Sequence, residues 1–381
     1  MPATYGFLST YPPTQCGLAT FNAALATHLS NGGSSGVVRL LSKDSVSGGI
    51  ELDRAAPRTV HTWHTDTPGG WRTAAEMLNR YDVAIIQHEY GIYPGDAGNE
   101  VLPLLRALTV PSIVVLHTVL SSPDPLQRQV LEQIAEAADA VVTMTDTARR
   151  RLTDGYDVDP RKISVIPHGA ASRGTGPRED HDRPTLLTWG LLGPGKGIEW
   201  AIRALALLGD LDPAPVYTVA GRTHPKVLEQ FGDVYRDSLK ELAASLGVTG
   251  SVRWEDAYLE EDELSRLIRS ADVVVLPYDS TEQVTSGVLI EAVGAGIPVV
   301  ATEFPHAVEL LADGPGLLVP HQDPEAMASA IRHALAEPSL SVGLTGLAGG
   351  PTLRWPAVAA RYQSLAARLL TRTPLAASVP A

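Results

Sequence analysis

One stretch of the chain, residues 271–302, alternates most clearly between apolar and polar segments. It contains a short, mostly β-branched apolar run (272–276), a polar loop (277–283), a helical segment (284–295) and a second apolar run (297–301). Continuous apolar runs of this length are typical of strands buried on both faces of a parallel sheet. We therefore expect a strand–loop–helix–strand unit, which is the repeating element of open α/β domains.

The helix in this stretch begins with residues that suit an anion-binding site. Thr285 and Ser286 are helix-start residues, and Gly287 leaves the backbone open to a ligand. The N–H groups of Ser286, Gly287 and Val288 lie at the positive end of the helix dipole, where a phosphate binds well. Glu291 lies two turns into the helix and would reach hydroxyls of the same ligand. The alternative is that Glu291 is an ordinary solvated helix residue.

Strands and helices alternate twice along the chain. In the first half, strands are expected at 4–9, 37–41, 82–87, 112–116, 140–144 and 162–166, and helices at 18–29, 70–80, 99–108, 125–138 and 146–153. In the second half, strands are expected at 185–189, 216–219, 251–254, 273–276, 298–301 and 316–319, and helices at 197–208, 225–246, 260–271, 284–295, 307–313 and 324–337. This order predicts two doubly wound, Rossmann-like α/β domains.

The domain boundaries follow from composition. Residues 170–184 are polar, rich in Gly and Pro and without a period, which is typical of a linker. We therefore predict an N-terminal domain over 1–175 and a C-terminal domain over 184–350. Residues 339–351 show no clear period, and residues 371–381 are expected to be a loose tail. Because open sheets bind ligands beyond the carboxyl ends of their strands, two such domains facing each other predict a cleft that holds the substrate.

Composition excludes several classes of protein. The chain has 381 residues and a net charge of −13, which argues against nucleic acid as a partner. Its one cysteine, Cys16, cannot form an internal disulfide and suits a reducing compartment, so we expect a cytoplasmic protein. We find no signal peptide and no apolar run long enough to span a membrane. The sequence leaves the oligomeric state open.

Polar and aromatic residues follow three strands of the first domain, where we expect them to line one edge of the sheet. The candidate residues at this edge are Tyr11, Gly17, His88, Glu89, Tyr90 and His117. Gly17 begins a helix, so its N–H is suited to an anion or a sugar hydroxyl. His88 and His117 end separate strands of one sheet and would face the same crevice. The alternatives are structural histidines and ordinary loop packing of the aromatic rings.

The first strand of the second domain ends in a glycine-rich turn, residues 190–197. The turn resembles a phosphate loop but lacks the spacing of the nucleotide-triphosphate P-loop. Gly195 would leave backbone amides accessible, and Lys196 would add a positive charge beside them. Arg222 follows the next strand at the same edge of the sheet. Together with the helix start at residues 285–287, these residues predict an anion pocket.

With these residues in view, the chain resembles the GT-B glycosyltransferases, and most of all the retaining enzymes of glycosyltransferase family 4. The resemblance runs from residue 11 to residue 370. It implies that the last helix, 355–371, crosses back to pack on the first domain. It also implies a histidine near the sugar O6, matched by His117, and a lysine on the leaving phosphates, matched by Lys196. The sequence departs from the family pattern at Gln283, where relatives have a glutamate eight positions before Glu291, and at Leu191, where many relatives have an arginine.

The resemblance implies a metal-independent hexosyltransferase that takes its sugar from a nucleotide-diphosphate donor without any cofactor. Lys196, Arg222 and the helix N–H groups would stabilise the departing phosphate, while Glu291 would bind the ribose and Gln283 the sugar. The implied stereochemistry is retention, by substitution on one face of the sugar. A small-molecule or saccharide acceptor would bind to the first domain. The residues expected to contact it are Tyr11, His88, Glu89 and Tyr90.

Two other functions fit the same residues. The first is a phosphorylase on this scaffold, because the changes at Leu191 and Gln283 would suit a smaller donor such as a sugar 1-phosphate. The second is a non-catalytic protein that binds sugars or nucleotides and has lost turnover. Comparing the binding of nucleotides with that of inorganic phosphate distinguishes the phosphorylase from a nucleotide-sugar enzyme. Hydrolysis of a donor distinguishes an enzyme from the non-catalytic protein.

Overall fold

A computed structural model describes residues 2–30, 35–43, 45, 55–171, 181–312, 316–337 and 350–372. The chain divides into two compact units, Met1–His168 with Trp355–Ala381, and Gly169–Arg354. Each unit is described by itself below. Among the described helices, none has the length and apolar character needed to cross a membrane.

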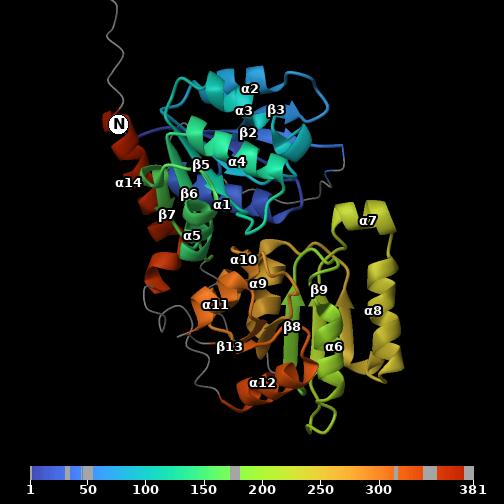
Figure 1. Cartoon of the computed structure of the whole chain (residues 1–381). Coiled ribbons are helices and arrows are strands. Elements are labelled where there is room, and N and C mark those ends of the chain that lie inside the picture. Colours follow the sequence, from blue (N-terminus) through green and yellow to red (C-terminus); the bar gives the residue numbers. More distant parts are fainter. Residues whose placement is uncertain are drawn as a thin grey trace, which may run out of the picture. The chain divides into compact units, whose positions relative to one another are not determined.

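The described part of the first unit contains a seven-stranded parallel sheet in the order β3-β2-β1-β4-β5-β6-β7 (Figure 1). The strands are β1 (Tyr5–Ser9), β2 (Gly36–Leu41), β3 (Arg58–His64), β4 (Val83–His88), β5 (Ser112–Leu116), β6 (Ala140–Thr143) and β7 (Ile163–Val165). The helices are α1 (Gly17–Ser30), α2 (Trp71–Leu78), α3 (Val101–Ala107), α4 (Pro125–Ala137), α5 (Asp146–Gly155) and α14 (Trp355–Arg372), with short 3-10 turns η1 (Asp96–Gly98) and η2 (Pro160–Lys162). The strand order changes direction between β1 and β4, which is where such sheets place their ligands.

The described part of the second unit contains a six-stranded parallel sheet in the order β10-β9-β8-β11-β12-β13. The strands are β8 (Thr185–Trp189), β9 (Val216–Ala220), β10 (Val252–Glu255), β11 (Val273–Leu276), β12 (Val299–Thr302) and β13 (Gly316–Val319). The helices are α6 (Ile198–Ala206), α7 (Pro225–Phe231), α8 (Val234–Ser245), α9 (Glu261–Ser270), α10 (Gly287–Gly294), α11 (Pro305–Leu311) and α12 (Pro324–Ala336), with 3-10 turns η3 (Thr249–Ser251) and η5 (Gly350–Leu353). Here the switch point lies between β8 and β11.

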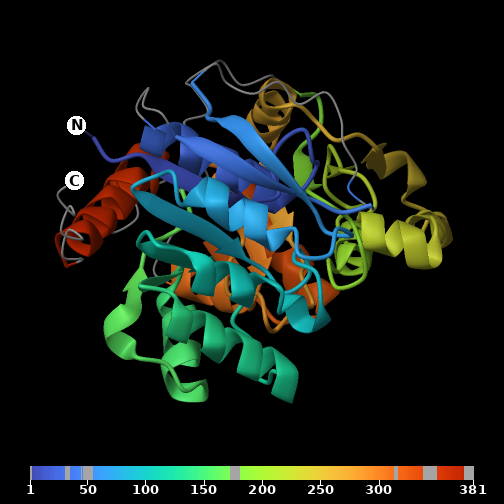
Figure 2. The same ribbon diagram turned by 90° about the horizontal axis from the view of Figure 1, so that it is seen from above.

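The core of the first unit includes the end of the chain. Helix α14 lies beside α1 in both views of the molecule (Figures 1 and 2), and the two helices share a buried apolar cluster. The ring of Trp355 packs edge-on against Phe21, with centroids 5.3 Å apart, and Tyr362 is fully buried. The expectation that the last helix packs on the first domain is therefore confirmed.

The two expected Rossmann-like sheets are confirmed, and the structure differs from the predicted elements in two places. Strand β3 (Arg58–His64) was not predicted, because it is an exposed edge strand whose polar side chains hide its period. The single helix expected over 225–246 is two helices, α7 and α8. The break occurs at Gly232, which has φ +60° and closes α7.

Several predicted segments lie outside the described residues. The predicted linker, residues 170–184, falls largely on residues 172–180, and the segment 339–351 falls largely on residues 338–349. Of the predicted tail, residues 371–381, only 371 and 372 are described. The predicted domain limits of 1–175 and 184–350 stay predictions.

Candidate functional site

Three loops meet at the carboxyl edge of the second unit's sheet. They comprise residues 190–197 after β8, 220–224 after β9 and 277–286 after β11. The N–H of Gly190 donates to the Ala220 carbonyl (3.0 Å), and the His224 N–H donates to the Leu192 carbonyl (2.7 Å). The first two loops therefore continue the pairing of β8 with β9 beyond the ends of the strands.

Two glycines allow these loops to approach each other closely. Gly197 has φ +63°, and a Cβ there would overlap the carbonyl oxygen of Pro277. Gly221 has φ +134°, and a Cβ there would overlap the carbonyl oxygen of Gly190. The N–H of Asp279 also donates to the Gly195 carbonyl at 3.0 Å. The glycine turn is thus held against the residues that follow β11.

Helix α10 presents free N–H groups beside this turn. Ser286 is the N-cap, and its Oγ accepts from the Leu289 N–H at 3.2 Å. Among the described residues, the N–H groups of Gly287 and Val288 have no hydrogen-bond partner. Val288 lies next to Gly190, since a Cβ on Gly190 would be 3.8 Å from a Val288 methyl group. Unpartnered N–H groups at the first turn of a helix are suited to binding an anion.

The structure differs from the sequence-based expectation for Ser286. Its N–H was expected to hold a phosphate, but it donates to Nδ1 of the buried His306 at 2.7 Å. The N–H of the residue immediately before α10 is therefore already paired with His306, whose Nδ1 is the acceptor. The N–H groups that remain available for an anion at this helix start are those of Gly287 and Val288.

Lys196 supplies the positive charge at this edge. Its ammonium lies 4.3 Å from the ring centroid of Tyr278, which is a cation–π contact. The Tyr278 ring is fully buried, and its hydroxyl has no partner within the described residues. Next to it, one Asp279 carboxylate oxygen accepts from Trp200 Nε1 at 3.1 Å. Sequence reasoning did not single out Tyr278, although it lies two residues after the end of a predicted strand.

The remaining predicted donor-side residues lie on the same loops and helix. The Oγ1 atom of Thr285 is buried without a partner among the described residues. Gln283 donates from Nε2 to the Thr285 carbonyl at 3.2 Å. Glu291 is half-buried in the second turn of α10, while Gly195 and Arg222 are exposed. The donor-binding roles of these residues stay predictions.

At the carboxyl edge of the first unit's sheet, three polar side chains form a hydrogen-bonded chain. Nε2 of His117 is 2.9 Å from Gln87 Oε1, and Gln87 Nε2 donates to Asn22 Oδ1 at 3.3 Å. Since Gln87 Oε1 accepts, the His117 proton is on Nε2 and Nδ1 is an acceptor. Burial, with smaller contributions from the nearby His168 and His88, lowers the pKa of His117 to about 3. His117 is therefore neutral at pH 7.

Two residues predicted to contact the acceptor are enclosed by the core. Tyr11 is fully buried, and its hydroxyl donates to the Pro57 carbonyl at 2.9 Å. His88 is also fully buried, stacks on Tyr93, and has no partner at either ring nitrogen among the described residues. Burial lowers the pKa of His88 to about 4. Neither ring has an exposed face for a sugar, because the strand ends turn these side chains inward.

The other first-unit candidates remain accessible. Glu89 accepts a hydrogen bond of 2.5 Å from the Thr118 hydroxyl and one of 3.0 Å from the Tyr90 N–H. Tyr90 is half-buried, and Gly17 is exposed at the first residue of α1. Sequence reasoning missed His168, which packs edge-on against Phe21 at 4.9 Å. The signal was its place after the strand expected at 162–166, at the same edge of the sheet.

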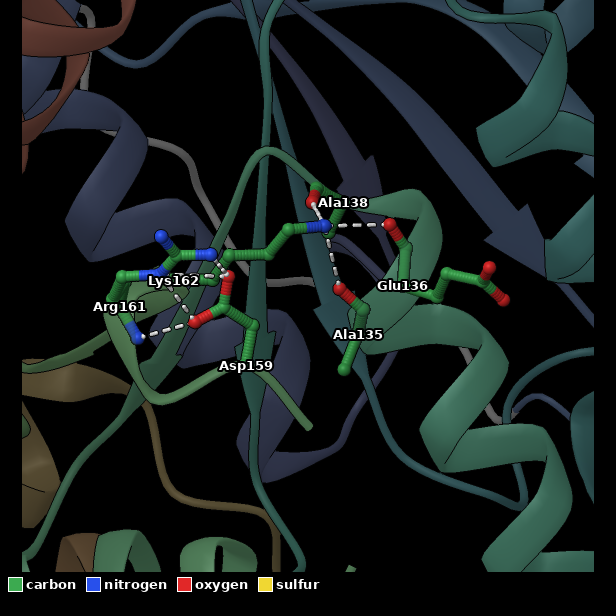
Figure 3. Close-up of polar contacts among 6 residues, drawn as sticks. All are labelled: Ala135, Glu136, Ala138, Asp159, Arg161 and Lys162. Atoms are coloured by element: carbon green, nitrogen blue, oxygen red, sulfur yellow. Dashed lines mark hydrogen bonds and ion pairs between the residues drawn. The ribbon is translucent and has the colours of Figure 1, made fainter. Parts of the chain in front are cut away.

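A shallow cavity of about 460 Å³ lies elsewhere in the first unit, where α4 ends and β7 begins. In Figure 3, Lys162 points at the end of α4 and donates to the carbonyls of Ala135, Glu136 and Ala138, at 3.2, 2.6 and 2.8 Å. Lys162 thus caps the negative end of the helix dipole. This cavity is at the amino edge of the sheet, opposite the edge that carries the candidate residues.

The arrangement of two parallel sheets with flanking helices is the GT-B architecture of solved glycosyltransferases. A glycosyltransferase from Rickettsia africae superposes with a TM-score of 0.75 at 16% identity, over 98% of this chain and 100% of the other. The Anabaena protein HepE in complex with UDP-glucose superposes with a TM-score of 0.68 at 16% identity, over 97% and 100% of the two chains. At these identities the likeness establishes the fold.

Sequence comparison then gives the family. Residues 183–337 match the model of glycosyl transferases group 1, and residues 49–171 match that of glycosyltransferase family 4. A D-inositol 3-phosphate glycosyltransferase from Corynebacterium glutamicum is 30% identical in an alignment of 291 positions that covers 69% of this chain and 68% of the relative. One from Frankia alni is 29% identical over 69% of this chain and 70% of the relative. The chain belongs to the group 1, family 4 glycosyltransferases.

Proposed function

We propose that this protein is a retaining glycosyltransferase that moves a hexosyl group from a nucleotide-diphosphate sugar to a hydroxyl of a small-molecule or saccharide acceptor. The observation that carries the proposal is the pair of unpartnered N–H groups on Gly287 and Val288 beside the Lys196 turn. The donor class is supported by the complex of HepE with UDP-glucose, a protein of the same fold. The acceptor class is supported by relatives named for D-inositol 3-phosphate.

The chemistry follows from where negative charge develops. The bond between the anomeric carbon and the phosphate oxygen breaks, and charge builds on the departing diphosphate. Lys196 and the N–H groups of Gly287 and Val288 stabilise this charge without a metal ion. The acceptor oxygen bonds to the anomeric carbon on the same face of the sugar. Its proton passes to the departing phosphate oxygen, so configuration is retained.

The other residues have supporting roles in this proposal. Glu291 binds the ribose hydroxyls, Gln283 binds the sugar, and Arg222 adds a second positive charge. His117 accepts a hydrogen bond from a sugar hydroxyl through Nδ1, because its Nε2 proton is held by Gln87. Glu89 and Tyr90 contact the acceptor.

Substituting Lys196→Ala tests the proposal. We expect kcat/KM to fall at least about tenfold, because a hydrogen bond to a charged group contributes roughly 1.5–3 kcal/mol. The assay follows release of UDP or GDP with a panel of polyol acceptors that includes D-inositol 3-phosphate, and NMR of the product reports the anomeric configuration. The matched control is Lys240→Ala, an exposed lysine on α8 that pairs with Asp237. Equal activity of Lys196→Ala and the wild type would refute this site, and an inverted product would refute retention.

Leu191 and Gln283 favour a second candidate, a phosphorylase that uses a sugar 1-phosphate. Both positions lack a charge that many relatives carry, and a smaller donor needs fewer charged contacts. Calorimetric titration with UDP, GDP and inorganic phosphate separates the two functions. Preference for a nucleotide supports the nucleotide-sugar enzyme, and preference for phosphate supports the phosphorylase. Donor hydrolysis that Lys196→Ala abolishes would eliminate a purely binding role.

A further inference from the structure

A buried arginine lies behind the proposed donor site. Arg236 is on α8, and its side chain is 3% exposed. Its Nη2 donates to the Gly221 carbonyl at 2.5 Å and lies 3.0 Å from Oδ1 of Asp256, whose side chain is 63% exposed. Gly221 and Asp256 follow the ends of two adjacent strands, β9 and β10. One nitrogen of Arg236 therefore joins two loops at the carboxyl edge of the sheet.

The remaining contacts of Arg236 are poor. Its Nε and Nη1 atoms are buried and have no hydrogen-bond partner in the part of the chain that the structure describes. A buried guanidinium with unsatisfied donors is disfavoured relative to an apolar side chain of similar size. Stability of the fold therefore does not account for an arginine at this position.

A path of contacts leads from Arg236 to the free N–H groups of α10. The Gly221 N–H donates to the Glu255 carbonyl at 2.8 Å, so Arg236 and β10 hold Gly221 from both of its sides. The backbone of Gly221 touches the carbonyl of Gly190 so closely that a Cβ would not fit. Gly190 in turn lies beside Val288, which carries one of the two unpartnered N–H groups.

We infer that Arg236 is a positioning residue for the donor site: it holds the Gly221–Gly190 junction so that the Lys196 turn and the first turn of α10 converge on one phosphate. The inference rests on the proposed function, because it concerns the donor site of that reaction. Arg236 acts through Gly221 and does not contact the ligand. The role explains why a charged side chain lies where an apolar one would pack better.

The test compares Arg236→Met with Arg253→Met, an exposed arginine on β10. We expect Arg236→Met to keep or raise the midpoint of chemical unfolding, since methionine fills the space without buried donors. In calorimetry, its Kd for UDP should rise about tenfold, an effect typical of a change in a packed contact network. Donor KM should rise in parallel while kcat at saturating donor changes little. Arg253→Met should match the wild type in every measurement.

Two further variants keep the test decisive if Arg236→Met does not fold. Arg236→Lys keeps one hydrogen-bond donor near the Gly221 carbonyl but loses the planar guanidinium group. Its UDP affinity should therefore lie between those of Arg236→Met and the wild type. Asp256→Ala leaves the Gly221 bond in place and should weaken UDP binding less than Arg236→Met does. Wild-type affinity for UDP in Arg236→Met, or a loss of stability with no separate loss of binding, would overturn the inference. Failure of the wild type to bind UDP would instead count against the proposed function.

Discussion

At the residue scale, the environment of Lys196 explains how a flexible side chain is held at the proposed donor site. Among the described residues, its ammonium makes no ion pair and no hydrogen bond, and the Tyr278 ring is its contact. A cation over a desolvated aromatic face is stabilised by about 2 kcal/mol, whereas a cation–π pair exposed to solvent is stabilised by less. Contact with the face of the ring does not use the N–H donors of the ammonium in hydrogen bonds. Lys196 is therefore anchored without its charge being neutralised.

Two substitutions at Tyr278 distinguish the contribution of the aromatic ring from that of its hydroxyl. We expect Tyr278→Phe to keep activity within about threefold, because the aromatic face that holds the cation remains. Tyr278→Leu should lower kcat/KM about tenfold further, since it removes that face. Steady-state kinetics of both variants, corrected for the folded fraction, measure the difference. Equal kcat/KM in the two variants would show that the ring does not anchor Lys196.

At the scale of the element, the donor site depends on close backbone contacts between the segments that precede α6 and α10. Gly197 is the N-cap of α6 in the left-handed conformation, at φ +63° and ψ +22°. Its position against the Pro277 carbonyl leaves no room for a side chain. The turn that carries Lys196 can therefore touch the loop after β11 only with glycine at this position.

Substituting Gly197→Ala tests this contact. We expect the left-handed conformation alone to cost about 1–2 kcal/mol of unfolding free energy, with a further loss from displacement of the Pro277 loop. The displaced turn should also weaken UDP binding, which calorimetry measures. Gly250→Ala is the control, because its Cβ would meet no atom within 4 Å. An unaltered denaturation midpoint and Kd in Gly197→Ala would contradict the close approach.

At the scale of the whole molecule, the first unit is completed by the end of the chain. Helix α14 contributes Trp355, Val358 and Tyr362 to the same cluster as Phe21 of α1. Because α14 covers α1, the first unit cannot reach its final core until the last helix has been added. The chain order therefore couples the folding of this unit to residues that follow the entire second unit.

Two substitutions at Tyr362 measure this dependence. Tyr362→Ala should destabilise the first unit by about 3–5 kcal/mol, as expected when a large buried aromatic ring is removed. Tyr362→Phe should be neutral or stabilising, because the buried hydroxyl has no partner among the described residues. Hydrogen exchange during denaturation locates the loss, and Ser364→Ala, on the exposed side of α14, is the control. A loss of protection centred on the second unit would argue against this role of the helix.

The sequence by itself determined the buried strands, the fold class and the start of helix α10, where the anion site is proposed. Residues 112–116, 185–189 and 273–276 form strands as predicted, because a strand buried on both faces leaves a local apolar run. The family resemblance added the return of the last helix to the first unit. What only the tertiary structure decided was the partner of each polar group. The inward turn of Tyr11, the capture of the Ser286 N–H by His306 and the anchoring of Lys196 by Tyr278 all join residues distant in sequence. Such contacts depend on packing between elements, which local composition and periodicity do not encode.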